Sequence, residues 1–298
     1  MAIPPTGATS YLSGRLEFLA KTQNPDGGWG YFPGKQSWIE PTAWALIALH
    51  GRSESTRAWE RILGWQGPDG SWRPGQDVQV NSWATALCVT IGHSRGEFGE
   101  PYKRGLHWLL HTFDAESTLY NKALVSIGYP LSRNPDHKAW PWKPGDSSWI
   151  EPTAHSLVAL KLARKRLNLP EIHERIAMGE AAILDQRCVD GGWNYGNTKV
   201  LGATLPSYPE TTALALVGLQ QSKADIGASL QFAEKLIAER QGRMASAWLT
   251  IALRLHGRNV PDSRYPDLAA NHDILVTAVE AIGAPGGTFG VLKTGDSQ

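Results

Sequence analysis

A repeated sequence unit constrains the fold of this chain more than any other feature. The residues Ser148–Ala154 repeat letter for letter those at Ser37–Ala43, and in both places a turn-forming segment and a tryptophan come before them. The unit occurs four times, with the tryptophan and the threonine of a Thr-Ala pair at Trp29 and Thr42, Trp72 and Thr85, Trp140 and Thr153, and Trp193 and Thr212. The two residues stand thirteen positions apart in three copies and nineteen in the fourth. A repeat of this kind predicts an architecture built from stacked, similar units.

The segments between the turns read as helices of two alternating kinds. Some are apolar on every side, as expected of buried helices, and others carry an apolar stripe on one face only. The predicted helices are Thr9–Gln23, Thr42–His50, Glu54–Trp65, Ser82–Ile91, Pro101–Thr112, Thr153–Ala163, Glu171–Gln186, Thr211–Gln220, Ile226–Arg240, Ala245–His256 and Asp267–Ile282. This alternation predicts an all-α fold, an α/α toroid with an inner and an outer ring of helices. An open solenoid also matches the repeats, but the last helices stay apolar, which favours closure.

The domain organisation follows from the place where the repeat pattern is interrupted. We expect one toroid domain over residues 1–283 and a loose tail over 284–298. Residues 113–133 interrupt the repeats as an insertion, with a short helix of its own at Leu119–Ile127.

Composition and charge exclude several classes of partner. The formal net charge is +1, which gives no electrostatic case for nucleic acid binding. The two cysteines do not form a disulfide framework, the N-terminus has no secretory signal pattern, and no apolar run is long enough to span a bilayer. We therefore expect a cytoplasmic protein with at most peripheral membrane contact. The sequence leaves a protein partner or a homodimer open.

The turns carry a family resemblance. Gln23 with Gly27-Gly28-Trp29, Gln66 with Gly70-Ser71-Trp72, and Gln186 with Gly191-Gly192-Trp193 resemble the Gln-Trp repeats of squalene–hopene and oxidosqualene cyclases. The resemblance covers most of the chain and implies the α/α toroid that these cyclases share with the β subunits of protein prenyltransferases. The motif is typical of the superfamily and does not name a reaction. We expect its glutamines to bond free N–H groups at the start of a neighbouring inner helix, and its tryptophans to stack over that junction.

The resemblance also directs attention to three glutamates. Class II triterpene cyclases carry Asp-x-Asp-Asp-Thr-Ala at the start of an inner helix, and the middle aspartate is the proton donor. Aligned on Thr-Ala, that acid falls on Glu40, Glu151 and Glu210, whereas the flanking aspartates are missing. A glutamate at a helix start faces the positive end of the helix dipole, which favours the carboxylate. These residues can therefore simply be the acidic first turn that each repeat needs.

The third copy differs from the others. His155 follows Glu151 by one helical turn, and Asp146 lies in the loop just before. We predict Glu151 as a catalytic acid tuned by His155 and Asp146, against the alternative of a satisfied polar cluster.

Aromatic residues gather at the predicted inner-helix entrances. Such rings could line a pocket for a polyene or a carbocation through cation–π contact, or could only pack the funnel. The predicted substrate-binding residues are Trp38, Trp44, Trp83, Trp140, Trp142, Trp149 and Tyr208, with Glu40 and Glu210. No metal and no cofactor are predicted, because neither Cys88 nor Cys188 stands in a zinc-ligand setting and no phosphate-cradling glycine loop is present.

Two functional hypotheses follow. The first is a terpenoid-cyclase-like isomerase that binds an isoprenoid or another apolar small molecule in the toroid funnel and starts a cyclisation or isomerisation with acid. The second is a carrier of a hydrophobic ligand, or an interaction scaffold, with the same fold and no chemistry. A funnel filled by side chains argues against the first.

Overall fold

The computed structural model describes residues 7–129, 131, 133–200, 202–239, 241–260 and 272–295. Within these residues the regular secondary structure is almost entirely helical, which confirms the predicted all-α class. The α-helices are α1 (Gly7–Lys21), α2 (Ile39–Ala48), α3 (Ser53–Leu63), α4 (Thr85–Ser94), α5 (Glu100–His111), α6 (Leu119–Ser126), α7 (Ile150–Arg164), α8 (Pro170–Asp185), α9 (Pro209–Gly218), α10 (Gly227–Ala238), α11 (Arg243–Leu255) and α12 (Ile274–Gly283). The described residues also form a pair of antiparallel two-residue strands, β1 (Lys199–Val200) and β2 (Ala203–Thr204), and a 3-10 helix, η2 (Phe289–Leu292).

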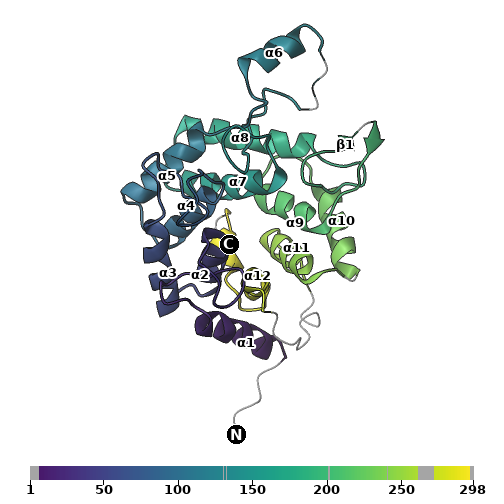
Figure 1. The fold of residues 1–298 in the computed structure, drawn as a ribbon. Helices are drawn as coiled ribbons and strands as arrows, with labels where there is room; N and C mark the ends of the chain where they lie inside the picture. Colours follow the sequence, from purple (N-terminus) through teal and green to yellow (C-terminus); the bar gives the residue numbers. More distant parts are fainter. Residues whose placement is uncertain are drawn as a thin grey trace.

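The helices form two concentric rings (Figure 1). In the inner ring α2, α4, α7, α9, α11 and α12 each pack against the next, and α12 returns to pack against α2. Helices α1, α3, α5, α8 and α10 cover this ring from outside. The contact between α12 and α2 closes the ring, so the fold is the predicted α/α toroid and not an open solenoid.

The two kinds of helix differ in burial as their sequences predict. In α2 every residue except Glu40 is buried, because neighbours surround the helix. The outer helix α3 buries only the stripe Ser55, Ala58, Trp59 and Ile62. Burial of apolar surface is the main favourable term in folding, and the inner ring supplies most of it here. No helix in the described ranges is long and apolar enough to cross a membrane.

The repeated tryptophans tie each outer helix to the following inner helix. The indole Nε1 of Trp29 donates to the carbonyl of Leu19 at 2.9 Å, and its backbone N–H donates to Thr42 Oγ1 at 2.9 Å. The other copies repeat the backbone bond, from Trp72 to Thr85 at 2.8 Å, from Trp140 to Thr153 at 3.2 Å and from Trp193 to Thr212 at 3.0 Å. This bond explains why the tryptophan and threonine recur at a fixed step. A buried N–H group without an acceptor costs free energy.

The glutamines of the repeat act differently from our prediction. Gln23 Nε2 donates to the carbonyl of Glu54 at 2.9 Å, in the first turn of the outer helix α3, and its Oε1 accepts from Arg57 at 3.1 Å. Gln66 makes the corresponding bonds to Pro101 at 2.8 Å and Arg104 at 2.6 Å. The motif therefore joins successive outer helices, and the prediction of a bond to inner-helix N–H groups was wrong.

The C-terminal segment also departs from the prediction. Residues 284–295 were expected to be a loose tail, yet Ala284, Leu292 and Thr294 are buried and η2 packs against α4 and α11. Gln220 Nε2 donates to the carbonyl of Leu292 at 3.0 Å, and Thr288 Oγ1 donates to that of Ile47 at 2.8 Å. The segment thus covers the end of the barrel at which the inner helices finish.

The insertion stands outside the rings and contains the predicted short helix as α6 (Figure 1). Thr118 caps this helix by accepting from the backbone N–H of Asn121.

Candidate functional site

Three inner helices begin with a glutamate at the same position. Glu40, Glu151 and Glu210 are each the second residue of α2, α7 and α9. Because these helices run in the same direction round the ring, the glutamates meet at one mouth of the barrel instead of being spread over the molecule. Glu151 lies close enough to Glu40 and Glu210 for both negative charges to raise its pKa. We call these residues the three-glutamate cluster.

The protonation state of Glu151 is set mainly by burial. Its side chain is only 20% exposed. Burial first, and then the charges of Glu40 and Glu210, raise its pKa from 4.5 to about 8. A change of this size corresponds to about 5 kcal/mol against the charged form. The helix dipole, worth about 1 kcal/mol in favour of the carboxylate, is smaller. Glu151 is therefore largely protonated at neutral pH, contrary to the carboxylate that its place at a helix start predicted.

The other two glutamates have different surroundings. Tyr31 donates its hydroxyl to Glu40 Oε2 at 2.5 Å. Burial raises the pKa of Glu40, with Glu210 and Asp273 adding to it, although the bond from Tyr31 acts the other way. Burial also raises the pKa of Glu210. The cluster thus contains three carboxyl groups in unequal environments, which is the condition under which carboxyls can take different acid and base roles.

His155 lies directly below Glu151 in a shell of aromatic rings. Its ring stacks on Trp83 with centroids 5.3 Å apart, and it also contacts Trp44 at 5.3 Å and Trp248 at 5.8 Å. Burial lowers the pKa of His155 to about 3, so the imidazole is neutral. Its Nε2 is 3.9 Å from Glu151 Oε1 and has no hydrogen-bond partner. A protonated carboxyl therefore stands beside a buried ring nitrogen that has no hydrogen-bond partner.

The rings around His155 form what we call the aromatic cluster: Trp44, Trp83, Trp142 and Trp248. Trp83 meets Trp142 edge to face at 5.2 Å, and Trp44 meets Trp248 at 5.0 Å. Trp44 and Trp248 are buried, whereas Trp83 and Trp142 are partly exposed. Side chains therefore fill the barrel axis at the level of His155, which argues against a substrate held deep in the funnel, as the first hypothesis expected.

Several residues of this site escaped sequence reasoning. Trp248 lies in a helix pair that has lost its Gly-Trp turn, yet it is the sixth residue of α11, as Trp44 is of α2 and His155 of α7. Counting residues from the start of each inner helix would have identified Trp248 as the counterpart of Trp44 and His155. Tyr31 and Tyr195 lie in loops at the mouth and are 36% and 54% exposed. The ring of Tyr195 lies 5.4 Å from that of Tyr208, a predicted substrate-binding residue that directly precedes α9.

Other predicted site residues have structural roles. Trp140 is buried and donates its indole N–H to the carbonyl of Leu109 at 2.9 Å, so it holds the repeat together as the other repeat tryptophans do. Its role as a substrate contact stays a prediction. Trp38 lies against Gly75, where a Cβ atom would come within 3.2 Å of the indole. Trp149, the residue before α7, is partly buried, and its backbone N–H donates to the carbonyl of Trp140.

Asp146 pairs with a lysine of its own loop. Its carboxylate lies 3.4 Å from Lys143 Nζ and is 38% exposed. The charges that raise the pKa of Glu151 belong to Glu40 and Glu210. The charges that act on Glu151 therefore come from other helices, and the tuning role of Asp146 stays a prediction.

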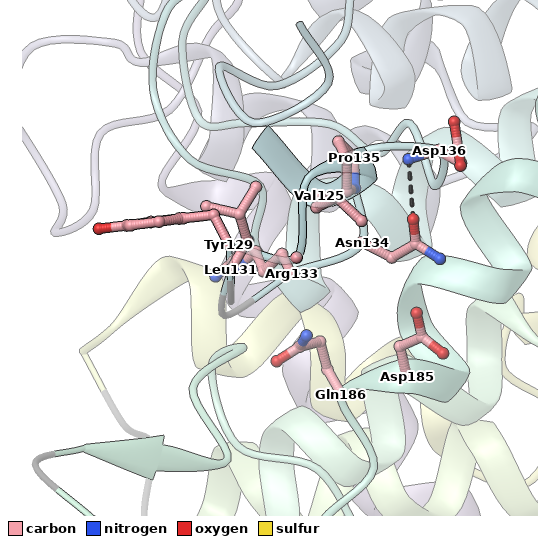
Figure 2. Close-up of a pocket in the computed structure, with 10 residues that line it drawn as sticks. Val125, Tyr129, Leu131, Arg133, Asn134, Pro135, Asp136, Asp185 and Gln186 are labelled. Atoms are coloured by element: carbon pink, nitrogen blue, oxygen red, sulfur yellow. Dashed lines mark hydrogen bonds between the residues drawn. The ribbon is translucent and has the colours of Figure 1, made fainter. Parts of the chain in front are cut away.

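A separate cavity lies between the insertion and the end of α8 (Figure 2). It has a volume of about 600 Å³ and is lined by Val125, Tyr129, Arg133, Asp185 and Gln186 among others. Figure 2 shows polar and apolar side chains mixed along it, with the backbone N–H of Asp136 bonded to Asn134. It contains none of the predicted site residues.

Comparisons with known proteins point to the fold. No family model and no curated protein matches the chain. The type II terpene cyclase MstE from Scytonema, without ligand, matches with a TM-score of 0.55 and 14% identity over 93% of this chain and 78% of that one. A variant of MstE in complex with geranylgeranyl dihydroxybenzoate matches with a TM-score of 0.58 and 12% identity over 97% of both chains.

Carbohydrate-active proteins match as well. An inactive variant of the α-1,6-mannanase GH76A of Salegentibacter sp. HEL1_6, in complex with α-1,6-mannotriose, gives a TM-score of 0.62 at 9% identity over 93% of this chain and 100% of that one. An α-amylase from Clostridium perfringens gives 0.60 at 8% identity over 94% and 98%. What all of them share with this chain is the α/α toroid.

Proposed function

We propose that the protein is an acid catalyst in which Glu151 donates a proton to an isoprenoid or similar apolar substrate at the barrel mouth. The observation that carries the proposal is a buried carboxyl with a pKa of about 8, adjacent to a cluster of tryptophans. A carboxyl that keeps its proton at neutral pH is the group that acid-initiated chemistry needs. The toroid of MstE, a terpene cyclase, supports the choice of substrate class.

In the proposed step the proton passes from Glu151 to an alkene carbon of the substrate. The resulting carbocation faces the partly exposed rings of Trp83 and Trp142, whose π electrons stabilise positive charge. Glu151 becomes a carboxylate close to that charge. Loss of a proton from a neighbouring carbon back to the Glu151 carboxylate ends the reaction, so the substrate is cyclised or isomerised with no net change in atoms and Glu151 regains its proton.

A second candidate is the cleavage of a glycosidic bond. It is favoured by the presence of further carboxyl groups near the protonated Glu151, since glycosidases use a carboxylic acid together with a carboxylate. The exposed pair Tyr195 and Tyr208 offers faces on which a sugar ring can pack. The toroids of the mannanase and the amylase support this candidate.

The test is incubation of the wild type and Glu151→Gln with squalene, linear polyprenyl alcohols and α-linked oligosaccharides, followed by mass spectrometry. We expect a cyclised or isomerised isoprenoid from the wild type and its loss in the variant. Shortened oligosaccharides would instead establish the second candidate. Ligand retained by both proteins without turnover would identify a carrier, and neither binding nor turnover would leave a scaffold.

A further inference from the structure

A cavity that the proposed chemistry does not use lies between the insertion and the end of α8 (Figure 2). Its volume of about 600 Å³ lies within the range of small-molecule sites, about 300–1,000 Å³. Three parts of the chain form its walls: the insertion with Val125 and Tyr129, the turn of the third repeat at Asn134–Asp136, and the end of α8 with Asp185 and Gln186. A ligand held there would contact all three parts at once.

Gln186 supplies an unengaged polar group to this cavity. In the second repeat Gln66 stands six residues before the tryptophan, and its amide is engaged by two backbone carbonyls and an arginine. In the fourth repeat Arg187 holds that position and forms the same backbone bridge to the tryptophan. Gln186 therefore lies one residue outside the motif. Its side-chain amide has no hydrogen-bond partner among the described residues, so it can both donate to and accept from a ligand.

The charged side chains that line the cavity already have partners. Asp136 Oδ1 lies 2.7 Å from Lys122 Nζ. Asp185 Oδ2 accepts from His137 Nδ1 at 2.5 Å. Arg133 donates to two backbone carbonyls. Among the described lining residues the cavity thus gives an ion no unpaired countercharge. A carboxylate has two oxygens, so both aspartates can still accept hydrogen bonds from a neutral ligand.

The remaining lining is aromatic or apolar. Tyr129 and Val125 are 57% and 44% exposed, and Leu131 and Pro135 line the cavity with them. A purely apolar ligand would leave the amide and carboxylate groups without partners, which costs free energy. A sugar matches both kinds of wall, because its hydroxyls donate and accept hydrogen bonds while the C–H face of its ring packs on an aromatic ring.

We infer that this cavity binds a neutral oligosaccharide, which packs on Tyr129 and forms hydrogen bonds with Gln186 and Asp185. The inference does not depend on the proposed function, because the cavity contains neither Glu151 nor any residue of the aromatic cluster. The insertion stands outside the rings, so a saccharide bound there leaves the mouth of the barrel open (Figure 1).

The test measures the binding of maltotriose, cellotriose and α-1,6-mannotriose at neutral pH by isothermal titration calorimetry. We expect at least one of them to bind with a Kd of about 1 mM or lower. Tyr129→Ala and Gln186→Ala should each weaken that binding about tenfold, through loss of ring packing and of hydrogen bonds. The matched control is Tyr120→Ala, since Tyr120 is a 72% exposed tyrosine of α6 that does not line the cavity, and it should leave the Kd unchanged. The negatively charged trigalacturonic acid should bind about tenfold more weakly than the neutral sugar.

Three results would overturn the inference. One is the failure of all three neutral sugars to bind at concentrations up to about 10 mM. Another is tighter binding of trigalacturonic acid than of any neutral sugar. The third is binding that both Tyr129→Ala and Gln186→Ala retain, and loss of that binding in Tyr208→Ala would assign the sugar to the mouth of the barrel. None of these results depends on whether Glu151 is catalytic.

Discussion

Replacing Glu151 by glutamine should stabilise the folded protein, and more so as the pH rises. The pKa of Glu151 is raised from 4.5 to about 8 in the folded state, so between these values the folded state holds a proton that the unfolded state has lost. The folded state then binds more protons than the unfolded state, and stability falls as the pH increases. Glutamine keeps the shape of the protonated carboxyl and does not ionise.

The size of the effect follows from the two pKa values. The raised pKa of Glu151 lowers the free energy of unfolding of the wild type by about 1 kcal/mol at pH 5 and about 3 kcal/mol at pH 7. At pH 9 this loss is close to its limit of about 5 kcal/mol. The variant should therefore gain about 4 kcal/mol over the wild type between pH 5 and pH 9.

The assay is urea unfolding of both proteins at pH 5, 7 and 9, followed by circular dichroism. Glu60→Gln serves as the matched control, since this glutamate is exposed on α3 and should change stability equally at all three values. A difference between Glu151→Gln and wild type that stays constant with pH would refute the reasoning. Such a result would mean that Glu151 is ionised in the folded protein.

Three further results are expected. Thr42→Val should lower the free energy of unfolding by about 1–3 kcal/mol in urea titrations because the backbone N–H of Trp29 loses its acceptor, whereas Thr42→Ser should be close to wild type. Lys161→Met should lower the free energy of unfolding by about 3 kcal/mol, because buried Lys161 pairs with Glu180 and donates to the carbonyls of Gly218 and Gln220. Adding Glu180→Leu should recover part of this loss in the same assay. No recovery would show that the two side chains are not coupled. If Glu151 is the catalytic acid, kcat/KM should fall as the pH rises through 8. Glu40→Gln should move that fall to lower pH, because it removes one of the charges that raise the pKa of Glu151. A pH profile that does not move would assign the fall to another group.

The fold could be predicted because its determinants are local and repeated. The step from Trp29 to Thr42 recurs in the chain, and it corresponds to a single hydrogen bond that every copy makes. The tail could not be predicted, since the few contacts that hold it, such as the bond from Gln220 to Leu292, join residues far apart in sequence.

The candidate site shows a similar limit. The spacing of Glu151 and His155 within one helix could be read from the sequence, and the structure places them 3.9 Å apart. Their protonation states could not, because these depend on burial and on charges from α2 and α9 that only the closed ring brings near. The loop residue Asp146 is close to Glu151 in sequence, yet it pairs with Lys143. Repetition of the glutamates favoured a purely structural role, whereas the parallel inner helices bring all three to one place.

Whether Glu151 keeps its proton at neutral pH can be measured directly by NMR titration of its side-chain carboxyl. The protein would be labelled with carbon-13 at the glutamate side-chain carboxyl, and the Glu151 resonance identified by its absence in Glu151→Gln. We predict a midpoint near pH 8 for this resonance. A midpoint near 4.5, the ordinary value for glutamate, would contradict it and remove the basis for an acid at the mouth of the barrel.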